Sequence, residues 1–365
     1  MKWEKVKLSE VTEYITDGDH QPAPKSDSGV LFVKIKDIQD NRLTFDNALF
    51  VPQEYYNRLP KNRKAEYGDT LYTVVGSYGI PAFVNHNIPF CFERNIALLH
   101  PNNRVIPKYL YYAVNNPIFY GNANNIANGS AQKLIPLSKL AGMEISVPPI
   151  ERQETIVNIL SAYDDLIENN QKQIKLLEEA AQRLYKEWFI DLRFPGHENV
   201  KIVDGVPEGW ERMVLSEVTS ILKRGISPKY SDNGKYSVIN QKCIRSSIMD
   251  ISESRRQEKE YVPTLNLQDS DTVICSTGTG TLGRVGRVYG DYPNTTFDSH
   301  VTLVRAKENP NYIYHVVKSQ QEYLMGMGRG STNQQELYRD VIERLVVLCP
   351  SQDILLKADR VLNAI

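Results

Sequence analysis

Apolar residues recur every three or four positions across residues 151–190. The steps alternate strictly between four and three, which is typical of a coiled-coil seam. The members of this seam, one of them polar, are Ile156, Leu160, Tyr163, Ile167, Asn170, Ile174, Leu177, Ala181, Leu184 and Trp188. The pattern predicts a helix over residues 152–187, about 50 Å long at ~1.5 Å per residue. Pro148 and Pro149 before it and Pro195-Gly196 after it are the breakers expected at its ends.

A coiled-coil seam needs an opposing helix. Asn170 either sets the register against that helix or simply faces solvent. Ile354, Ala358, Val361 and Ile365 begin the same spacing where the sequence ends. Because these four positions match only part of the seam, we expect the long helix to pair with another copy of the chain or with helices of a partner protein.

On both sides of the helix, β-branched and aromatic runs alternate with Gly, Pro and Asn turns. Strands are predicted at residues 30–35, 70–75, 236–240 and 272–276, and helices at 107–115 and 311–321. The pattern indicates the α+β class, with two strand-rich modules.

The two modules are copies of each other. WEKVKLSEVT at residues 3–12 returns as WERMVLSEVT at 210–219, with seven of ten positions identical. Two further blocks, beginning at Gly68 and Gly129, return in the same order at Ser270 and Gly330. Three matched blocks indicate a duplicated domain of roughly 200 residues. Two such modules suit a partner with two similar sites, such as a two-part DNA sequence.

Composition restricts the class of protein. The chain has 365 residues, 41% hydrophobic and 24% charged, without an apolar run approaching the ~20 residues of a membrane span. We therefore expect a soluble cytoplasmic protein with no membrane contact. The four cysteines and six histidines lack metal-ligand or redox spacing, so we expect reduced thiols and no metal site.

Charge is unevenly distributed along the chain. Residues 1–150 carry 16 basic and 14 acidic side chains, residues 201–350 carry 19 and 18, and residues 151–190 carry 5 and 8. Phosphate attraction would therefore depend on local clusters or on a partner subunit. The candidate clusters are Arg58, Lys61, Arg63 and Lys64 in the first module and Lys223, Arg224, Lys229, Lys242 and Arg245 in the second. The alternative is that they are ordinary solvated loops.

Motifs that would indicate catalysis fail on their context. GTGTLGRV at residues 278–285 matches a nucleotide-binding glycine loop, but a strand rather than a helix is predicted after it. NPIF at residues 116–119 resembles an adenine methyltransferase motif, but a helix ended by Asn-Pro explains it better. We find no catalytic constellation.

Longer stretches carry a resemblance to a known family. They are residues 129–160, with GSAQKLIPLSKLAGMEISVPPIERQETIVNIL, residues 184–196, with LYKEWFIDLRFPG, and residues 205–211, with GVPEGWE. In order on a duplicated frame, they resemble the specificity subunit of Type I restriction-modification systems. The resemblance implies target recognition domains at 1–150 and 196–350, a central conserved coiled-coil helix at 151–195, and the start of a distal conserved helix at 351–365. It also implies that this second, C-terminal helix is truncated.

The resemblance further implies a non-catalytic subunit. Each recognition domain would read one half of a bipartite double-stranded DNA target, and the helix would set the spacer. Two modification subunits would bring AdoMet, and two restriction subunits would bring ATP and Mg. The alternatives are a coiled-coil scaffold with two protein- or peptide-binding modules, and an enzyme that uses the Gly278 loop.

Base-reading residues are predicted in turn-rich loops, because Arg pairs with guanine and Asn or Gln with adenine. The candidates are Lys34, Lys36, Arg63, Ser77, Tyr78, Gln132 and Lys133 in the first module and Asn240, Gln241, Lys242, Thr279, Arg284 and Asn333 in the second.

Overall fold

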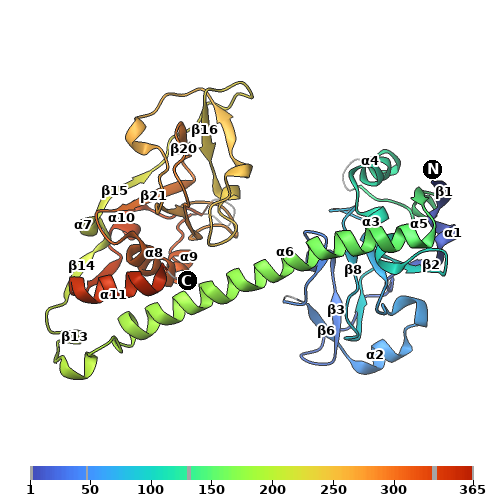
Figure 1. The fold of residues 1–365 in the computed structure, drawn as a ribbon, viewed down its shortest axis with the longest axis horizontal. Helices are drawn as coiled ribbons and strands as arrows, with labels where there is room; N and C mark the ends of the chain where they lie inside the picture. Colours follow the sequence, from blue (N-terminus) through green and yellow to red (C-terminus); the bar gives the residue numbers. More distant parts are fainter. Residues whose placement is uncertain (1–2, 47, 130–132, 331–334, 364–365) are drawn as a thin grey trace. The chain divides into compact units, whose positions relative to one another are not determined.

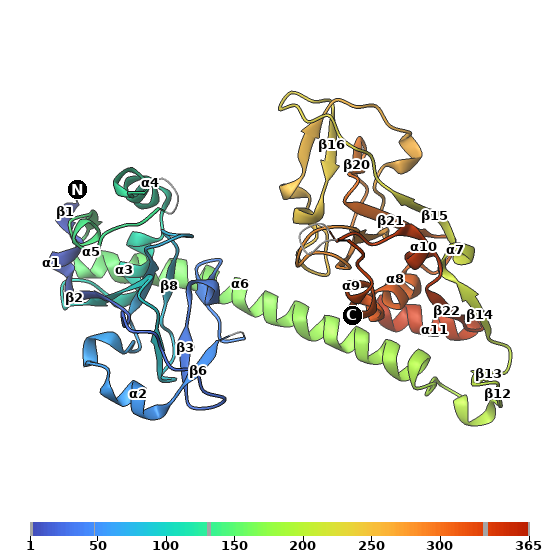
Figure 2. The same cartoon turned by 180° about the vertical axis from the view of Figure 1, so that it is seen from behind.

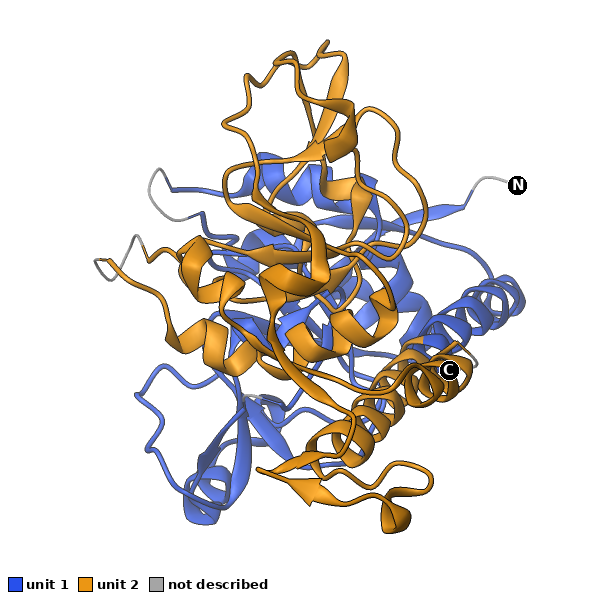
Figure 3. Cartoon of the chain, turned by 90° about the vertical axis from the view of Figure 1, so that its left-hand side faces the viewer, with its two compact units in different colours: residues 1–170 blue, residues 171–365 orange. Residues whose placement is uncertain are grey.

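The computed structural model describes residues 3–46, 48–129, 133–330 and 335–363. It divides into two compact units, unit 1 with residues Met1–Asn170 and unit 2 with Gln171–Ile365 (Figure 3). The division falls within α6 (Ile150–Tyr185), a single helix of 36 residues. The long helix predicted from the seam is therefore confirmed.

Unit 1 is built around a four-stranded antiparallel sheet in the order β2-β10-β7-β8 (Figure 1). A second sheet has the order β6-β3-β9, with β3 and β9 parallel. Smaller pairs are β1-β11 and β4-β5. The strands are β1 (Glu4–Lys7), β2 (Thr12–Asp17), β3 (Val30–Val33), β4 (Ile38–Gln39), β5 (Arg42–Leu43), β6 (Leu49–Val51), β7 (Thr70–Thr73), β8 (Pro81–Phe83), β9 (Phe90–Phe92), β10 (Ile96–Pro101) and β11 (Glu144–Val147). The helices are α1 (Leu8–Val11), α2 (Gln53–Arg58), α3 (Pro107–Val114), α4 (Pro117–Ile126) and α5 (Leu137–Ala141).

Unit 2 repeats this plan. Its main sheet has the order β15-β21-β18-β19, and its second sheet has the order β17-β16-β20, with β16 and β20 parallel (Figure 2). Smaller pairs are β14-β22 and β12-β13. The strands are β12 (Ile202–Val203), β13 (Val206–Pro207), β14 (Glu211–Val214), β15 (Thr219–Arg224), β16 (Tyr236–Ile239), β17 (Arg255–Gln257), β18 (Thr272–Cys275), β19 (Val285–Arg287), β20 (Thr295–Phe297), β21 (Val301–Ala306) and β22 (Val346–Cys349). The helices are α7 (Leu215–Val218), α8 (Pro310–Ser319), α9 (Gln321–Gly326), α10 (Arg339–Glu343) and α11 (Gln352–Leu362). Equal strand orders confirm the duplication.

Each copy needs a glycine at the end of the first strand of its main sheet. Gly18 follows β2 and Gly225 follows β15. A β-carbon at Gly18 would collide with the main-chain oxygen of Phe92, and one at Gly225 with the main-chain oxygen of Phe297. The chain crosses the second sheet so closely at these points that no larger residue fits.

The first turn of α6 is held in unit 1 by Gln153, whose side chain is almost fully buried. Its amide donates to the carbonyl oxygens of Pro148 at 2.9 Å and Arg104 at 3.1 Å, and it accepts from the main-chain N–H of Ile106 at 2.8 Å. Three main-chain groups would be left unpaired without this side chain, so Gln153 sets where the helix begins.

The last turns of α6 pack within unit 2. Tyr185 and Phe189 are buried in a core shared with Trp210 and Tyr312, and Ala181 is also buried. Burying side chains as large as Tyr185 and Phe189 stabilises the unit by roughly 1.5–3 kcal/mol each. A five-residue π-helical turn, Lys186–Ile190, ends this helix.

The buried face of α6 differs from the predicted seam at this end. Leu184 and Trp188 are only half-buried, and Tyr185 and Phe189 take the buried positions. The difference arises because this end of α6 packs against the core of unit 2, which accepts side chains spaced four residues apart. The alternating spacing of four and three residues is the one expected for packing against a second helix. Near the start of α6, Ile156 packs partly against the core of unit 1. Between the two ends of the helix, the side chains of Tyr163 and Ile167 are 64% and 49% exposed within the chain.

Candidate nucleic-acid interface

In both units, loops gather at one end of the main sheet, which we call the loop end. It comprises residues 17–20, 75–79, 93–95, 128–129 and 133–134 in unit 1, and residues 224–227, 277–283, 298–300, 329–330 and 335–336 in unit 2. Sheet register brings these segments together. Asp17 pairs with Ala97 and Ile96 with Thr73, and Arg224 pairs with Thr302 and Val301 with Cys275.

In unit 1 the loop end contains a polar cluster that the sequence partly predicted. The Tyr78 hydroxyl hydrogen-bonds to Asn124 Oδ1, and Lys133 Nζ lies 3.0 Å from that oxygen and 3.4 Å from the Tyr78 hydroxyl. Exposed Ser77 adjoins them. Tyr78, Ser77 and Lys133 therefore lie together, whereas Gln132 lies outside the described residues. Asn124, on α4, was not predicted.

The predicted basic cluster of unit 1 is only partly available. Arg63 Nη1 bonds to Asp19 Oδ1 at 3.2 Å, and Asp19 also accepts from the Tyr55 hydroxyl at 3.0 Å. Lys64 Nζ lies 4.8 Å from the centre of the Tyr56 ring, and Lys61 lies 3.6 Å from Glu66. Arg58 is exposed at the end of α2. Because Arg63 is already paired with a carboxylate, its attraction for phosphate is weakened.

Lys34 lines a surface pocket of unit 1. Lys34 caps a 3₁₀ turn, η1 (Ile35–Asp37), and its main-chain N–H donates to Asp37 at 2.8 Å. The pocket, of about 400 Å³, is also lined by His20, Lys25 and Arg94. Lys36 is exposed one turn further along.

In unit 2 the structure gives Asn240 a structural role. Its side chain is buried and caps the 3₁₀ turn η5 (Gln241–Cys243) by accepting from the main-chain N–H of Lys242 at 2.8 Å. The capping hydrogen bond holds this oxygen in the turn, and the assignment of Asn240 as a base contact stays a prediction. Gln241 is half-buried and lies next to Gly278, and Lys242 is exposed.

The other predicted residues of unit 2 are spread over its surface. Thr279 is exposed in the loop after β18, and Arg284 is half-buried just before β19. Arg245 lies 3.8 Å from Glu253, and Lys229 lies 2.9 Å from Glu258. Lys223 is exposed on β15. Asn333 lies outside the described residues.

Sequence reasoning missed the best-connected group of the unit 2 loop end. Arg224 was proposed only as a free cation, yet its guanidinium hydrogen-bonds to the Glu336 carboxylate and to the main-chain oxygen of Ser299. The Thr277 hydroxyl hydrogen-bonds to His300 Nδ1. Burial raises the pKa of Asp298 in this group, and the main-chain N–H of His300, 2.8 Å away, opposes that rise. Aligning the two copies residue by residue would have pointed to these positions.

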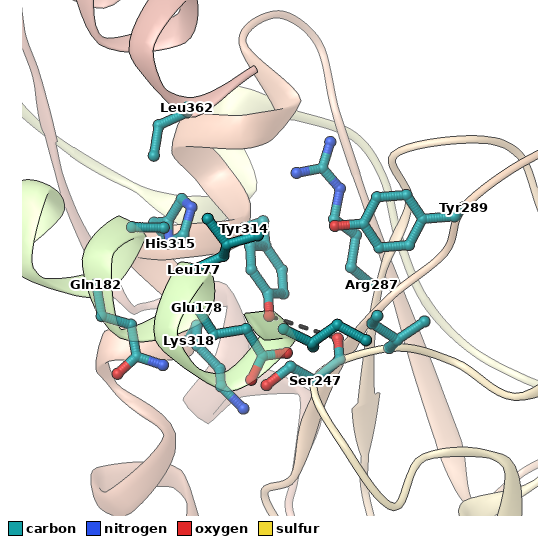
Figure 4. Close-up of a pocket in the computed structure, with 13 residues that line it drawn as sticks. Leu177, Glu178, Gln182, Ser247, Arg287, Tyr289, Tyr314, His315, Lys318 and Leu362 are labelled. Carbon is teal, nitrogen blue, oxygen red and sulfur yellow. Dashed lines mark hydrogen bonds between the residues drawn. The ribbon is translucent and has the colours of Figure 1, made fainter. Parts of the chain in front are cut away.

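A smaller pocket of unit 2, of about 210 Å³, lies where α6 meets α8 (Figure 4). Two of its polar groups bond within the unit: Lys318 Nζ donates to Gln321 Oε1 at 2.9 Å, and the Tyr314 hydroxyl donates to the main-chain oxygen of Ser247 at 3.4 Å. Burial lowers the pKa of Lys318. We interpret this pocket as part of the surface of unit 2 against which α6 packs.

Within the described ranges, no cluster of three His, Cys, Asp or Glu residues could hold a metal ion. Burial raises the pKa of the Cys91 and Cys275 thiols to about 12, so both remain protonated and unreactive near neutral pH. The Gly278 loop leads into strand β19 rather than into a helix, as the sequence predicted.

Comparison with known proteins places this duplicated fold in a family. The family model for the Type I restriction modification DNA specificity domain matches residues 1–179 and 207–354. The chain therefore belongs to this family of specificity domains. Its two copies correspond to the two matched stretches.

Individual relatives agree with this assignment. The chain is 33% identical over 172 residues to the Type I restriction enzyme MjaIX specificity subunit of Methanocaldococcus jannaschii, which covers 44% of this chain and 40% of that relative. It is 21% identical over 408 residues to the Type I restriction enzyme HindI specificity subunit of Haemophilus influenzae, covering 89% and 85%. A crystal structure of a Type I restriction-modification S subunit from M. genitalium has a similar fold, with a TM-score of 0.56 and 16% identity, covering 100% of this chain and 91% of that one.

The matched lengths differ among these relatives. The alignments cover 40% of the MjaIX subunit and 56% of the putative MjaX specificity subunit from the same organism.

Of the helices in the described part of the chain, none is long and apolar enough to cross a membrane.

Proposed function

We propose that this chain recognises the DNA target of a Type I restriction-modification complex, with each unit reading one half of a bipartite double-stranded site. The observation that supports this most directly is one backbone frame built twice with different side chains at its loop end. Two similar frames can dock on DNA in a similar way, while different side chains select different bases.

Exposed basic residues would supply the contacts to phosphate. Lys36 and Arg58 in unit 1 and Lys223 and Lys242 in unit 2 are exposed. With a formal net charge of -1, the chain needs help from a more basic partner to hold DNA tightly. We therefore propose that this chain selects the DNA sequence and that its partner subunits contribute much of the binding affinity.

The long helix would dock two modification subunits and set the spacer between the half-sites. In this proposal the chain itself is non-catalytic. Methyl transfer from AdoMet would take place on the modification subunits, and ATP and Mg would be used by restriction subunits where these are present. The exposed middle of α6, with Ile167 and Ile174, would bind helices of the modification subunits or a second copy of the chain. All of this would take place in the cytoplasm.

The proposal is tested by mapping methylated bases in genomic DNA from cells with and without this gene. We expect a two-part motif, separated by a spacer of constant length, to be methylated only when the gene is present. An identical set of methylated sites in both cultures would refute the proposed function.

A further inference from the structure

Because the fold is duplicated, the side chains at corresponding backbone positions of the two units can be compared. Val74 N–H donates to the Asn95 carbonyl at 2.9 Å in unit 1, and Ser276 N–H donates to the His300 carbonyl at 2.8 Å in unit 2. Ile135 N–H donates to Val74 at 2.9 Å, as Leu337 N–H donates to Ser276 at 2.8 Å. These hydrogen bonds fix which residues correspond at the two loop ends.

A two-way main-chain pair continues the correspondence. Asn128 and Leu134 exchange N–H···O bonds of 2.9 and 2.8 Å, and Arg329 and Glu336 exchange bonds of 3.0 and 2.9 Å. Residue 134 also bridges to Val75, and residue 336 to Thr277. The backbone at the loop end is therefore the same in both units.

Several side chains on this shared backbone differ between the two units. At five corresponding positions, unit 1 and unit 2 carry, respectively, Asp17 and Arg224, Val75 and Thr277, Asn95 and His300, Asn128 and Arg329, and Leu134 and Glu336. We call these the five rim positions. Each is exposed or half-buried, so a core constraint does not explain the change.

At the opposite end of each module, two pairs of corresponding side chains are identical. Thr12 and Thr219 both bond to the carbonyl of a leucine four residues earlier, at 2.8 and 3.0 Å. The Tyr109 hydroxyl bonds to the Ser146 carbonyl on β11, and the Tyr312 hydroxyl bonds to the Leu348 carbonyl on β22. Identical side chains make identical contacts there. At the five rim positions, by contrast, the side chains differ, and this is the end where a frame used twice must distinguish two targets.

Two rim positions present side chains suited to reading bases. Arg329 is exposed, and its guanidinium lies 5.7 Å from the centre of the Tyr338 ring. Stacking on a ring orients the guanidinium without using its in-plane N–H donors. Asn128 is exposed, and its main chain exchanges two hydrogen bonds with Leu134. In the major groove, arginine pairs with guanine, and asparagine pairs with adenine.

The other rim residues of unit 2 support this geometry. Glu336 accepts from the Arg224 side chain while its main chain holds Arg329. Arg224 is itself tied to the Ser299 carbonyl. Arg224 and Glu336 are thus positioning residues, whereas Arg329 is an exposed side chain whose guanidinium lies over the Tyr338 ring.

We propose that the five rim positions determine the base preference of each half-site, with Arg329 selecting a guanine in one half and Asn128 an adenine at the corresponding place in the other. This inference rests on the proposed function. It adds a residue-level rule: corresponding positions of the two units read corresponding base pairs.

The test is selection from a pool of randomised duplexes by the full chain together with its modification subunit. Arg329→Asn is compared with the wild type and with Arg344→Asn, an exposed arginine of unit 2 at the end of α10. We expect Arg329→Asn to lower the preference for guanine at one position of one half-site by roughly 10- to 100-fold, in favour of adenine. Asn128→Arg should make the converse change in the other half-site, and Arg344→Asn should keep the wild-type motif.

The outcomes separate this inference from the function on which it rests. A wild-type complex that enriches no sequence would refute the proposed function. A wild type that enriches a two-part motif, together with an Arg329→Asn variant that enriches the same motif with equal strength at every position, would overturn the inference alone. Equal weakening of binding to all duplexes would also overturn it, because it would assign Arg329 to phosphate. Far-UV circular dichroism of each variant confirms that the fold is retained.

Discussion

Arg305 holds the buried carboxylate of Asp271 through two hydrogen bonds of 2.7 Å, one from Nε and one from Nη2. The same guanidinium donates to the carbonyls of Thr264 and Asn266 at 2.9 and 2.8 Å. It therefore ties β21 to the start of β18 and to the turn before it. Unit 1 places Asp69 and His100 at the corresponding positions, 2.6 Å apart.

Replacing Arg305 should therefore destabilise unit 2. Arg305→Met leaves the Asp271 carboxylate, whose side chain is only 1% exposed, without its cation, and we expect the free energy of unfolding to fall by roughly 3–5 kcal/mol. Urea denaturation followed by tryptophan fluorescence measures this, because Trp210 is buried in unit 2. Arg344→Met, at an exposed position, should change the value by no more than ~0.5 kcal/mol. Adding Asp271→Asn should recover part of the loss, and a stability equal to the control would contradict the prediction.

Unit 2 should lose stability in mild acid through His315. Burial lowers the pKa of His315 from its ordinary value of 6.5 to about 4. The unfolded chain therefore binds a proton in the range between pH 6.5 and 4 that the folded chain does not. The stabilisation is complete above pH 6.5 and is lost as the pH falls towards 4, by about 3 kcal/mol in all.

The measurement is urea denaturation at several pH values for the wild type and for His315→Gln, whose side chain does not titrate. The difference between the two free energies of unfolding should change with pH only below about 6.5. Parallel pH profiles would exclude His315 as the source of acid sensitivity.

A charge on the exposed stretch of α6 should disturb assembly without disturbing the fold. Ile167 is 49% exposed, so Ile167→Asp should change the free energy of unfolding by less than ~1 kcal/mol. It should nevertheless abolish self-association or binding of the modification subunit, because either partner would have to bury the new carboxylate. Asn169→Asp, which adds the same charge off the seam, should assemble normally. Light scattering at several protein concentrations decides the matter, and equal assembly of both variants would rule out this face.

Lengthening α6 should lengthen the DNA spacer. Seven residues inserted after Asn170 keep the seam in phase and add about 10 Å, which corresponds to roughly three base pairs. Methylation mapping should then find both half-sites unchanged and the spacer longer. An insertion of three or four residues rotates the seam and should impair assembly. A methylated motif with its original spacer would disprove the role of the helix as a ruler.

Local patterns were sufficient to predict several elements of this protein. The four strands and the two shorter helices predicted from apolar runs between turn residues are present as β3, β7, β16, β18, α3 and α8. These predictions succeed because side-chain periodicity and turn residues act over a few positions. The repeat is equally visible, since two copies of a fold need similar residues at similar places in the core.

Tertiary structure decided which side chains act together. Arg224 and Glu336, which hydrogen-bond to each other, are 112 residues apart in the sequence. From the sequence alone Asn240 is a polar loop residue, and only the structure shows that its buried side chain accepts a hydrogen bond from the main-chain N–H of Lys242. The sequence by itself determined the duplicated α+β modules and the long helix, because periodicity and repetition are properties of the order of residues. Only the fold determined that Tyr185 and Phe189 replace the seam in the core and that five divergent side chains share one end of each sheet. Those relationships depend on sheet register and packing between distant segments, which no local pattern specifies.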